Sequence, residues 1–175
     1  MSEIAYIDES RRRPRYLLAA ALIDHQAVAT VRQAVRALAP RGGSTRRHFV
    51  RESDASRRKC LAAYRALDGV TVLIYEHRGH GQPPVHQRAE CLELMASELL
   101  GRSIDRLILD HVDDAQRRRD RQLLGRRLDG TGISYSHEPA HSTEALLWLP
   151  DAAAWCAGRP DWRHQLHDWA TIRRI

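Results

Sequence analysis

Five short apolar runs, separated by polar turns, predict the strands of this chain. Residues 4–8 alternate in character, with Tyr6 and Asp8 on one face, which is the period of a half-buried strand. Residues 16–23 form an unbroken apolar run, as expected of a central strand covered on both faces. Further apolar or β-branched runs predict strands at residues 70–76, 107–110 and 133–136.

Apolar residues spaced three or four positions apart predict the helices between and after these strands. The predicted helices cover about residues 28–38, 54–67, 86–100, 115–128 and 146–156. In the tail, Trp162, Leu166, Trp169 and Ile172 repeat at helical spacing. They predict an amphipathic helix within residues 159–175 that packs on the domain or on a second copy of the chain, as a homodimer.

The order of these elements is that of an α/β domain. An antiparallel meander of three strands, followed by strand–helix units, predicts a mixed five-stranded sheet with helices on both faces. The 175 residues are enough for one domain with a substantial core, and no internal repeat or low-complexity linker divides them. We therefore expect one domain over residues 1–158, completed by the tail helix.

Composition places the chain among cytoplasmic globular proteins. Apolar residues make up 43%, and no apolar run reaches the roughly 18 residues that cross a membrane. The first residues lack the basic and apolar regions of a signal peptide. Cys60, Cys91 and Cys156 are scattered without a CxxC pair, which argues against a disulfide framework or a zinc site and for a reducing compartment.

The chain carries a net charge of +6, which favours an anionic partner such as nucleic acid. Lys59 is the only lysine, so a GC-rich genome would give the same arginine bias without selection for phosphate binding. Arginines crowd the predicted fourth helix, where Arg117, Arg118, Arg119 and Arg121 could bind a nucleic-acid backbone. A solvated helix face, paired with nearby aspartates, is the alternative.

Two aspartates follow predicted strands that could be parallel neighbours. Asp8 ends the first strand and Asp110 the fourth, so both carboxylates would emerge at the carboxyl edge of the sheet, where α/β sheets bind ligands. Two adjacent carboxylates repel each other unless they share a cation or a proton. Hard oxygen ligands without thiolates suit Mg²⁺ or Mn²⁺. The alternative is that each aspartate caps a turn.

Four short motifs, taken in order, resemble a known family. They are AYIDES at residues 5–10, RHF at 47–49, LILDHVDD at 107–114 and LLWLPDAAAW at 146–155. Together they resemble a bacterial family of ribonuclease H-like, or retroviral integrase-like, proteins. Members of that family open with a D-E-S-G strand end, carry a middle histidine and a fourth-strand aspartate, and close with a helix similar to L-Q-L-A-D-L-I-A-W. The resemblance spans residues 4–158.

The resemblance implies a ribonuclease H-like fold whose acidic residues bind one or two divalent metals. Asp8, Asp110 and Asp151 take the places of the metal ligands, Glu9 completes the first motif and His48 matches the middle histidine. Such enzymes usually add a helix glutamate. Glu90 is our candidate, with Glu93, Glu98 or a merely solvated helix face as alternatives.

The sequence departs from the family pattern at three positions. Arg11 replaces the glycine of D-E-S-G, and Trp148 and Pro150 replace a glutamine and an alanine of the last motif. Because proline suits the first turn of a helix, Asp151 should lie near the positive end of the helix dipole, which favours its ionised form.

These observations predict a metal-dependent phosphodiester hydrolase, a nuclease, acting on nucleic acid. Asp8, Asp110 and Asp151 would hold Mg²⁺ or Mn²⁺, which would activate water. Two alternatives stay open. One is a catalytically inert module that binds nucleic acid or protein on the same fold, and the other is a metal-dependent enzyme acting on a small phosphorylated substrate.

Overall fold

The fold is a mixed six-stranded sheet with helices on both faces, in a computed structural model that describes residues 2–39, 48–79, 81–138 and 144–175. The strands are β1 (Glu3–Arg12), β2 (Arg15–Asp24), β3 (Val70–His77), β4 (Ile104–Asp110), β5 (Ser134–Glu138) and β6 (Ala170–Arg174). The helices are α1 (Val28–Arg36), α2 (Asp54–Arg65), α3 (Pro84–Leu99), α4 (Asp114–Leu128), α5 (Trp148–Ala157) and α6 (Pro160–Arg163). Short 3₁₀ turns occupy η1 (Phe49–Arg51), η2 (Ala145–Leu147) and η3 (His164–Leu166).

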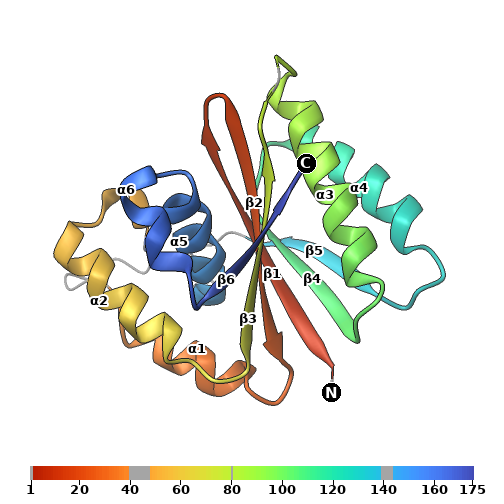
Figure 1. The fold of residues 1–175 in the computed structure, drawn as a ribbon. Coiled ribbons are helices and arrows are strands. Elements are labelled where there is room, and N and C mark those ends of the chain that lie inside the picture. Colours follow the sequence, from red (N-terminus) through yellow and green to blue (C-terminus); the bar gives the residue numbers. More distant parts are fainter. Residues whose placement is uncertain (1, 40–47, 80, 139–143) are drawn as a thin grey trace.

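The strand order β5-β4-β1-β2-β3-β6 brings most carboxyl ends to one edge. β1 and β2 form an antiparallel hairpin, and β3 is antiparallel to β2. The pairs β1–β4, β4–β5 and β3–β6 are parallel. Five strands therefore end at the edge where β2 begins. The β1–β2 hairpin and the C-terminus lie at this upper edge, opposite the N-terminus (Figure 1).

Two apolar cores sandwich the sheet. α1, α2, α5 and α6 cover one face, and α3 and α4 cover the other (Figure 1). Successive strand residues face opposite sides, so Tyr6 and Ile108 belong to the α5 core while Ile7 and Leu109 belong to the α3 core. β2 is buried on both faces, as its apolar run predicts. Each fully buried Leu or Ile contributes about 1.5–3 kcal/mol.

The tail is where the sequence prediction is wrong. Residues 159–175 do not form one amphipathic helix: α6 and η3 are short, and the chain then pairs with β3 as the sixth strand. The predicted apolar positions Trp162, Leu166 and Trp169 are buried in the α5 core. β-branched Thr171 and Ile172 suit a strand, and pairing them satisfies the backbone groups of the β3 edge. The predicted sheet of five strands is one strand short for this reason.

Among the described residues, no helix has the length and apolar character needed to cross a membrane.

Candidate functional site

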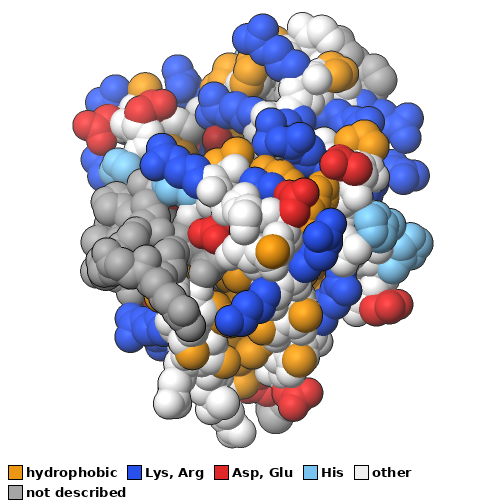
Figure 2. All heavy atoms as spheres, turned by 90° about the vertical axis from the view of Figure 1, so that its left-hand side faces the viewer, with side chains coloured by type: hydrophobic (Ala, Val, Ile, Leu, Met, Phe, Trp, Pro, Cys, Tyr) orange, Lys and Arg blue, Asp and Glu red, His pale blue; other side chains and the backbone are white. Residues whose placement is uncertain are grey.

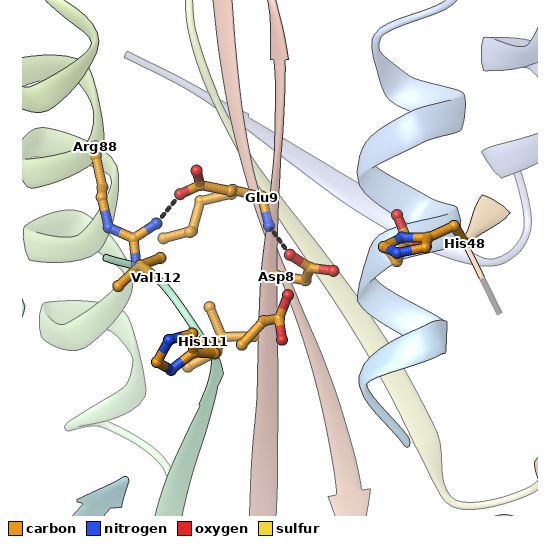
Figure 3. Close-up of a pocket in the computed structure, with 10 residues that line it drawn as sticks. Asp8, Glu9, His48, Arg88, His111 and Val112 are labelled. Atoms are coloured by element: carbon orange, nitrogen blue, oxygen red, sulfur yellow. Dashed lines mark hydrogen bonds and ion pairs between the residues drawn. The ribbon is translucent and has the colours of Figure 1, made fainter. Parts of the chain in front are cut away.

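A cavity of about 250 Å³ opens at the carboxyl edge of the sheet. Its lining comprises Ile7, Asp8, Glu9, Leu18, His48, Arg88, Asp110, His111, Val112 and Asp151. Five of the six residues that the sequence proposes as catalytic therefore share one cavity, and Glu90 is the exception. In Figure 3, Asp8 and Glu9 lie between Arg88 on α3 and His48 on the α5 side.

The pairing of β1 with β4 brings Asp8 and Asp110 together. Ile7 pairs with Leu109 in parallel register, so each aspartate occupies the next position along its strand. Both follow the alternation that sends Tyr6 and Ile108 into the α5 core, and neighbouring strands lie about 4.8 Å apart. The two carboxylates thus lie on the same face of adjacent strands, Asp110 at the last residue of β4 and Asp8 within β1, which continues to Arg12. The sequence prediction that the first strand ends at Asp8 is therefore wrong, because pairing with β2 extends β1 through the hairpin. The repulsion between the two carboxylates favours a cation or a shared proton between them.

Asp151 reaches the cavity from the first turn of α5. Pro150 also lies in that turn, where proline is compatible with a helix. The dipole of α5 therefore favours the ionised form of Asp151. Its Oδ2 accepts a hydrogen bond of 3.0 Å from the Phe49 amide, which attaches the segment carrying His48 to the start of α5.

Glu9 faces the opposite side of β1 and is already bound by protein donors. The Tyr16 hydroxyl, Arg88 and Arg11 all contact its carboxylate, with Arg11 Nη2 at 2.9 Å. Burial raises the pKa of Tyr16, so its hydroxyl stays protonated and donates. These contacts make Glu9 an anchor at the cavity wall.

Arg88 connects this wall to a buried polar network. Its guanidinium is only 3% exposed and binds Asp120 on α4 at 2.6–3.2 Å. Asp120 also accepts from Gln116 Nε2 at 2.8 Å and contacts His137 Nε2 at 3.2 Å. Burial acts to raise the pKa of Asp120, but the hydrogen bonds from His137 and Arg88 outweigh it and hold that pKa well below its usual range.

Sequence reasoning missed both Arg88 and Asp120, although a signal exists. Arg88 precedes Cys91, Leu92 and Met95 by three, four and seven positions, so it lies in the buried stripe of α3. Asp120 likewise precedes Leu124 by four positions on α4. A charged residue inside an apolar helical stripe indicates a buried ion pair.

Glu90 lies outside the cavity and binds a histidine. Its Oε2 is 3.0 Å from His77 Nε2, and the Gly79 amide donates to His77 Nδ1 at 2.9 Å. Because Nδ1 accepts, the proton is on Nε2, which donates to Glu90. The alternatives Glu93 and Glu98 are also engaged elsewhere, with Arg127 and with Tyr75 and Arg173 respectively.

The predicted arginine helix is α4, which begins just after Val112 of the cavity lining. Arg117 pairs with Asp114 at 2.8 Å, and the exposed side chains on the same helix include Arg118, Arg119 and Arg121. Asp120 is the inward-facing residue between them. The outer faces of α4 are therefore basic and start beside the candidate site.

The side chains of the carboxylate cavity have the donor chemistry of a hard-metal site. The described residues contain no group of three or more His, Cys, Asp or Glu side chains already arranged to hold a metal. The chemistry of the lining nevertheless suits a hard cation, since Asp8, Asp110 and Asp151 supply carboxylate oxygens and no cysteine is among the described lining residues. A cavity of about 250 Å³ also has room for an ion with several waters, each taking roughly 30 Å³.

Comparisons with known proteins support the fold. The sequence matches no protein-family model and no curated protein. In structure the chain is similar to RNase HII from the PCNA:RNase HII complex of Archaeoglobus fulgidus, with a TM-score of 0.56 and 13% identity over 94% of this chain and 76% of that chain. The predicted α/β fold with a mixed sheet and helices on both faces is thus confirmed, and it is similar to the fold of an RNase HII. Membership of the D-E-S-G motif family stays a prediction.

Proposed function

We propose that this chain is a divalent-metal-dependent phosphodiester hydrolase acting on nucleic acid. The observation that carries the proposal is the meeting of Asp8, Asp110 and Asp151, from three separate elements, in one cavity at the carboxyl edge. Ligands of open α/β sheets bind at this edge. The likeness to an RNase HII supports the same reaction class.

Asp8, Asp110 and Asp151 would hold one or two Mg²⁺ or Mn²⁺ ions. A bound ion of this kind lowers the pKa of its water and neutralises charge on the transferring phosphate. The protein orients two of these ligands: Asp151 lies near the positive end of the α5 dipole, and the Glu9 amide donates to Asp8 Oδ1 at 2.6 Å.

His48 would serve as a proton donor or acceptor at the reacting phosphate. It lines the cavity opposite Arg88, on the far side of Asp8 (Figure 3). The bond between Phe49 and Asp151 places its backbone beside the carboxylates. An imidazole can transfer a proton near neutral pH. Glu9, held by Arg88 and Tyr16, would position the part of β1 that carries Asp8.

The outer face of α4 would contact the substrate backbone. Arg118, Arg119 and Arg121 are exposed on a helix that starts beside the cavity, and Arg117 lies one turn from its N-terminus. Arginine binds phosphate in a bidentate manner without reading base sequence. We therefore expect these residues to add affinity rather than sequence preference.

Cleavage assays with matched variants test the proposal. Wild type should cut single-stranded or duplex DNA, RNA or their hybrid in Mg²⁺ or Mn²⁺ and stop in EDTA. Asp8→Asn and Asp110→Asn should lose at least about a hundredfold in rate, since removing a charge from a metal ligand removes transition-state stabilisation. Asp105→Asn is the control, because Asp105 is an exposed residue at the other end of β4. Cleavage that survives in Asp8→Asn and in EDTA would refute the proposal.

One feature favours the inert binding module as the second candidate. Arg88 places a buried positive charge at the cavity wall, where it pairs with Glu9. No described three-donor group is preassembled either. A wild-type protein that binds nucleic acid but cuts none of the substrates with any divalent metal would select this alternative.

A further inference from the structure

A second hollow, of about 660 Å³, lies at the tip of the β1–β2 hairpin on the same edge of the sheet. It is lined by Pro14, Arg15, Glu76, Arg78, Pro160, Arg163 and Arg174. Segments far apart in sequence thus bring four arginine side chains to the same hollow as the Glu76 carboxylate. The face over α2, α5 and α6 shows Lys and Arg side chains across its upper half (Figure 2).

Glu76 organises these arginines but cannot neutralise them. It is 3% exposed and receives two bonds from Arg163, at 3.0 and 2.7 Å. These bonds hold the pKa of Glu76 below its usual range, so it is ionised at neutral pH. Arg15 and Arg174 lie farther from it, at 3.6 and 3.5 Å, and are 39% and 62% exposed. Because one carboxylate balances one guanidinium, the hollow keeps a large excess of positive charge facing solvent.

The positive surface continues toward the carboxylate cavity. A neighbouring hollow of about 680 Å³ shares Pro14 and Arg15 and adds Arg11 and Arg13. Arg11 in turn binds Glu9, which lines the carboxylate cavity. Glu76 is the one acidic side chain among the described residues that line these two hollows. We call their six arginines, Arg11, Arg13, Arg15, Arg78, Arg163 and Arg174, the hairpin arginine track.

We propose that the hairpin arginine track binds the phosphodiester backbone of a nucleic-acid strand on one side of the scissile phosphate. The position relative to the scissile phosphate rests on the proposed nuclease function. The exposed members of the track are Arg11, Arg13, Arg78 and Arg174. Arginines gathered at a concave surface are suited to bidentate phosphate contacts. Tyr16, the aromatic residue among the described lining, is buried and bonded to Glu9, so bases have no stacking platform there. Binding is therefore independent of sequence.

The length of the hairpin sets the reach of the track. Asp8 and Arg13 are five residues apart, which is roughly 16 Å along an extended strand. A duplex strand advances about 3.4 Å per nucleotide. In a duplex substrate the track therefore contacts phosphates about five nucleotides from the bond that is cut.

Fluorescence anisotropy with a labelled 20-nucleotide strand in EDTA tests the binding surface. The variant Arg13→Ala/Arg78→Ala/Arg174→Ala removes three exposed arginines of the track. The control Arg36→Ala/Arg65→Ala/Arg102→Ala removes the same charge from exposed positions outside the track and outside α4. Thermal unfolding establishes that both variants fold.

For a single strand, each lost phosphate contact lowers the slope of log affinity against log salt by about 0.7. Loss of three contacts should therefore make the slope about two units smaller. At ~0.1 M salt the track variant should bind up to about a hundredfold more weakly than wild type. The control should stay within about threefold of wild type. Equal affinities for the two folded triple variants would overturn the proposal.

Cleavage of substrates with different flanks separates this proposal from the nuclease proposal. Wild type should cut substrates that extend only about two nucleotides on the track side slowly. Its rate on these short substrates should equal the rate of the track variant on long substrates. A wild type that cuts both lengths equally would overturn the track while leaving the nuclease intact. Salt-dependent binding loss confined to the track variant, with no cleavage by wild type, would support the track and refute the nuclease.

Discussion

Replacing Arg88 with methionine should strongly destabilise the fold, because it leaves a buried charge without its main partner. Arg88 and Asp120 are 3% and 2% exposed, and they share contacts at 2.6–3.2 Å. Removing one member of such a pair costs about 3–5 kcal/mol, whereas replacing both with apolar residues is often close to neutral. Arg88→Met should therefore lose about 3–5 kcal/mol, and adding Asp120→Leu should recover much of it.

The pH dependence of that loss gives a second, independent readout. The folded-state pKa of Asp120 lies below its unfolded value near 3.9, so its contribution to stability is present above that pH and is lost as pH falls toward the folded pKa. Without Arg88 the depression of this pKa shrinks. The stability difference between wild type and Arg88→Met should consequently be largest near neutral pH and decrease below about pH 4.

Urea unfolding between about pH 3 and pH 7 measures both effects. Arg126→Met is the matched control, since Arg126 is exposed on α4, and it should change stability by no more than about 0.5 kcal/mol. An Arg88→Met variant within about 1 kcal/mol of wild type at pH 7 would refute the reasoning. So would a difference that does not depend on pH.

Two further predictions concern the cysteines and the tail. All three thiols are buried, and burial raises the pKa of Cys91 and Cys156 to about 12. A thiol reagent at pH 8 should therefore react with no cysteine in the folded protein and with three cysteines after unfolding. Rapid reaction of the folded protein would contradict this prediction. Deleting residues 170–175 removes β6 and exposes the unpaired edge of β3. The truncated protein should therefore lose stability and self-associate, which light scattering measures. A truncated protein that stays monomeric with an unchanged melting temperature would contradict this prediction.

The sequence was informative where local pattern and edge geometry decide the outcome. Strand alternation predicted that Asp8 and Tyr6 share one face of the first strand. The expectation that the first and fourth strands are parallel neighbours then predicted Asp110 beside Asp8, and the pairing of β1 with β4 agrees with it. Pro150 likewise indicated where α5 begins. These inferences depend on one element at a time and on the rule that parallel strands end at the same edge.

Prediction failed where partners distant in sequence decide. Whether residues 170–174 form a helix or a strand depends on the open edge of β3, almost a hundred positions earlier in the chain. Glu90 was proposed for the site, but it lies two residues after Arg88 on α3. Two such positions on an α-helix differ in direction by about 200°. Glu90 therefore points away from the cavity that Arg88 lines, and it binds His77 instead. The hollow around Glu76 is formed by four separate segments of the chain, and no local sequence motif predicts it.

A Mn²⁺-soaked crystal with an anomalous difference map tests the central claim most directly. We expect a peak between the Asp8 and Asp110 carboxylates, with oxygens of these residues and of Asp151 roughly 2–2.6 Å away. The peak should vanish in Asp8→Asn crystals and persist in Asp105→Asn crystals. A well-ordered cavity without the peak at millimolar Mn²⁺, or a metal held elsewhere on the protein, would contradict the account.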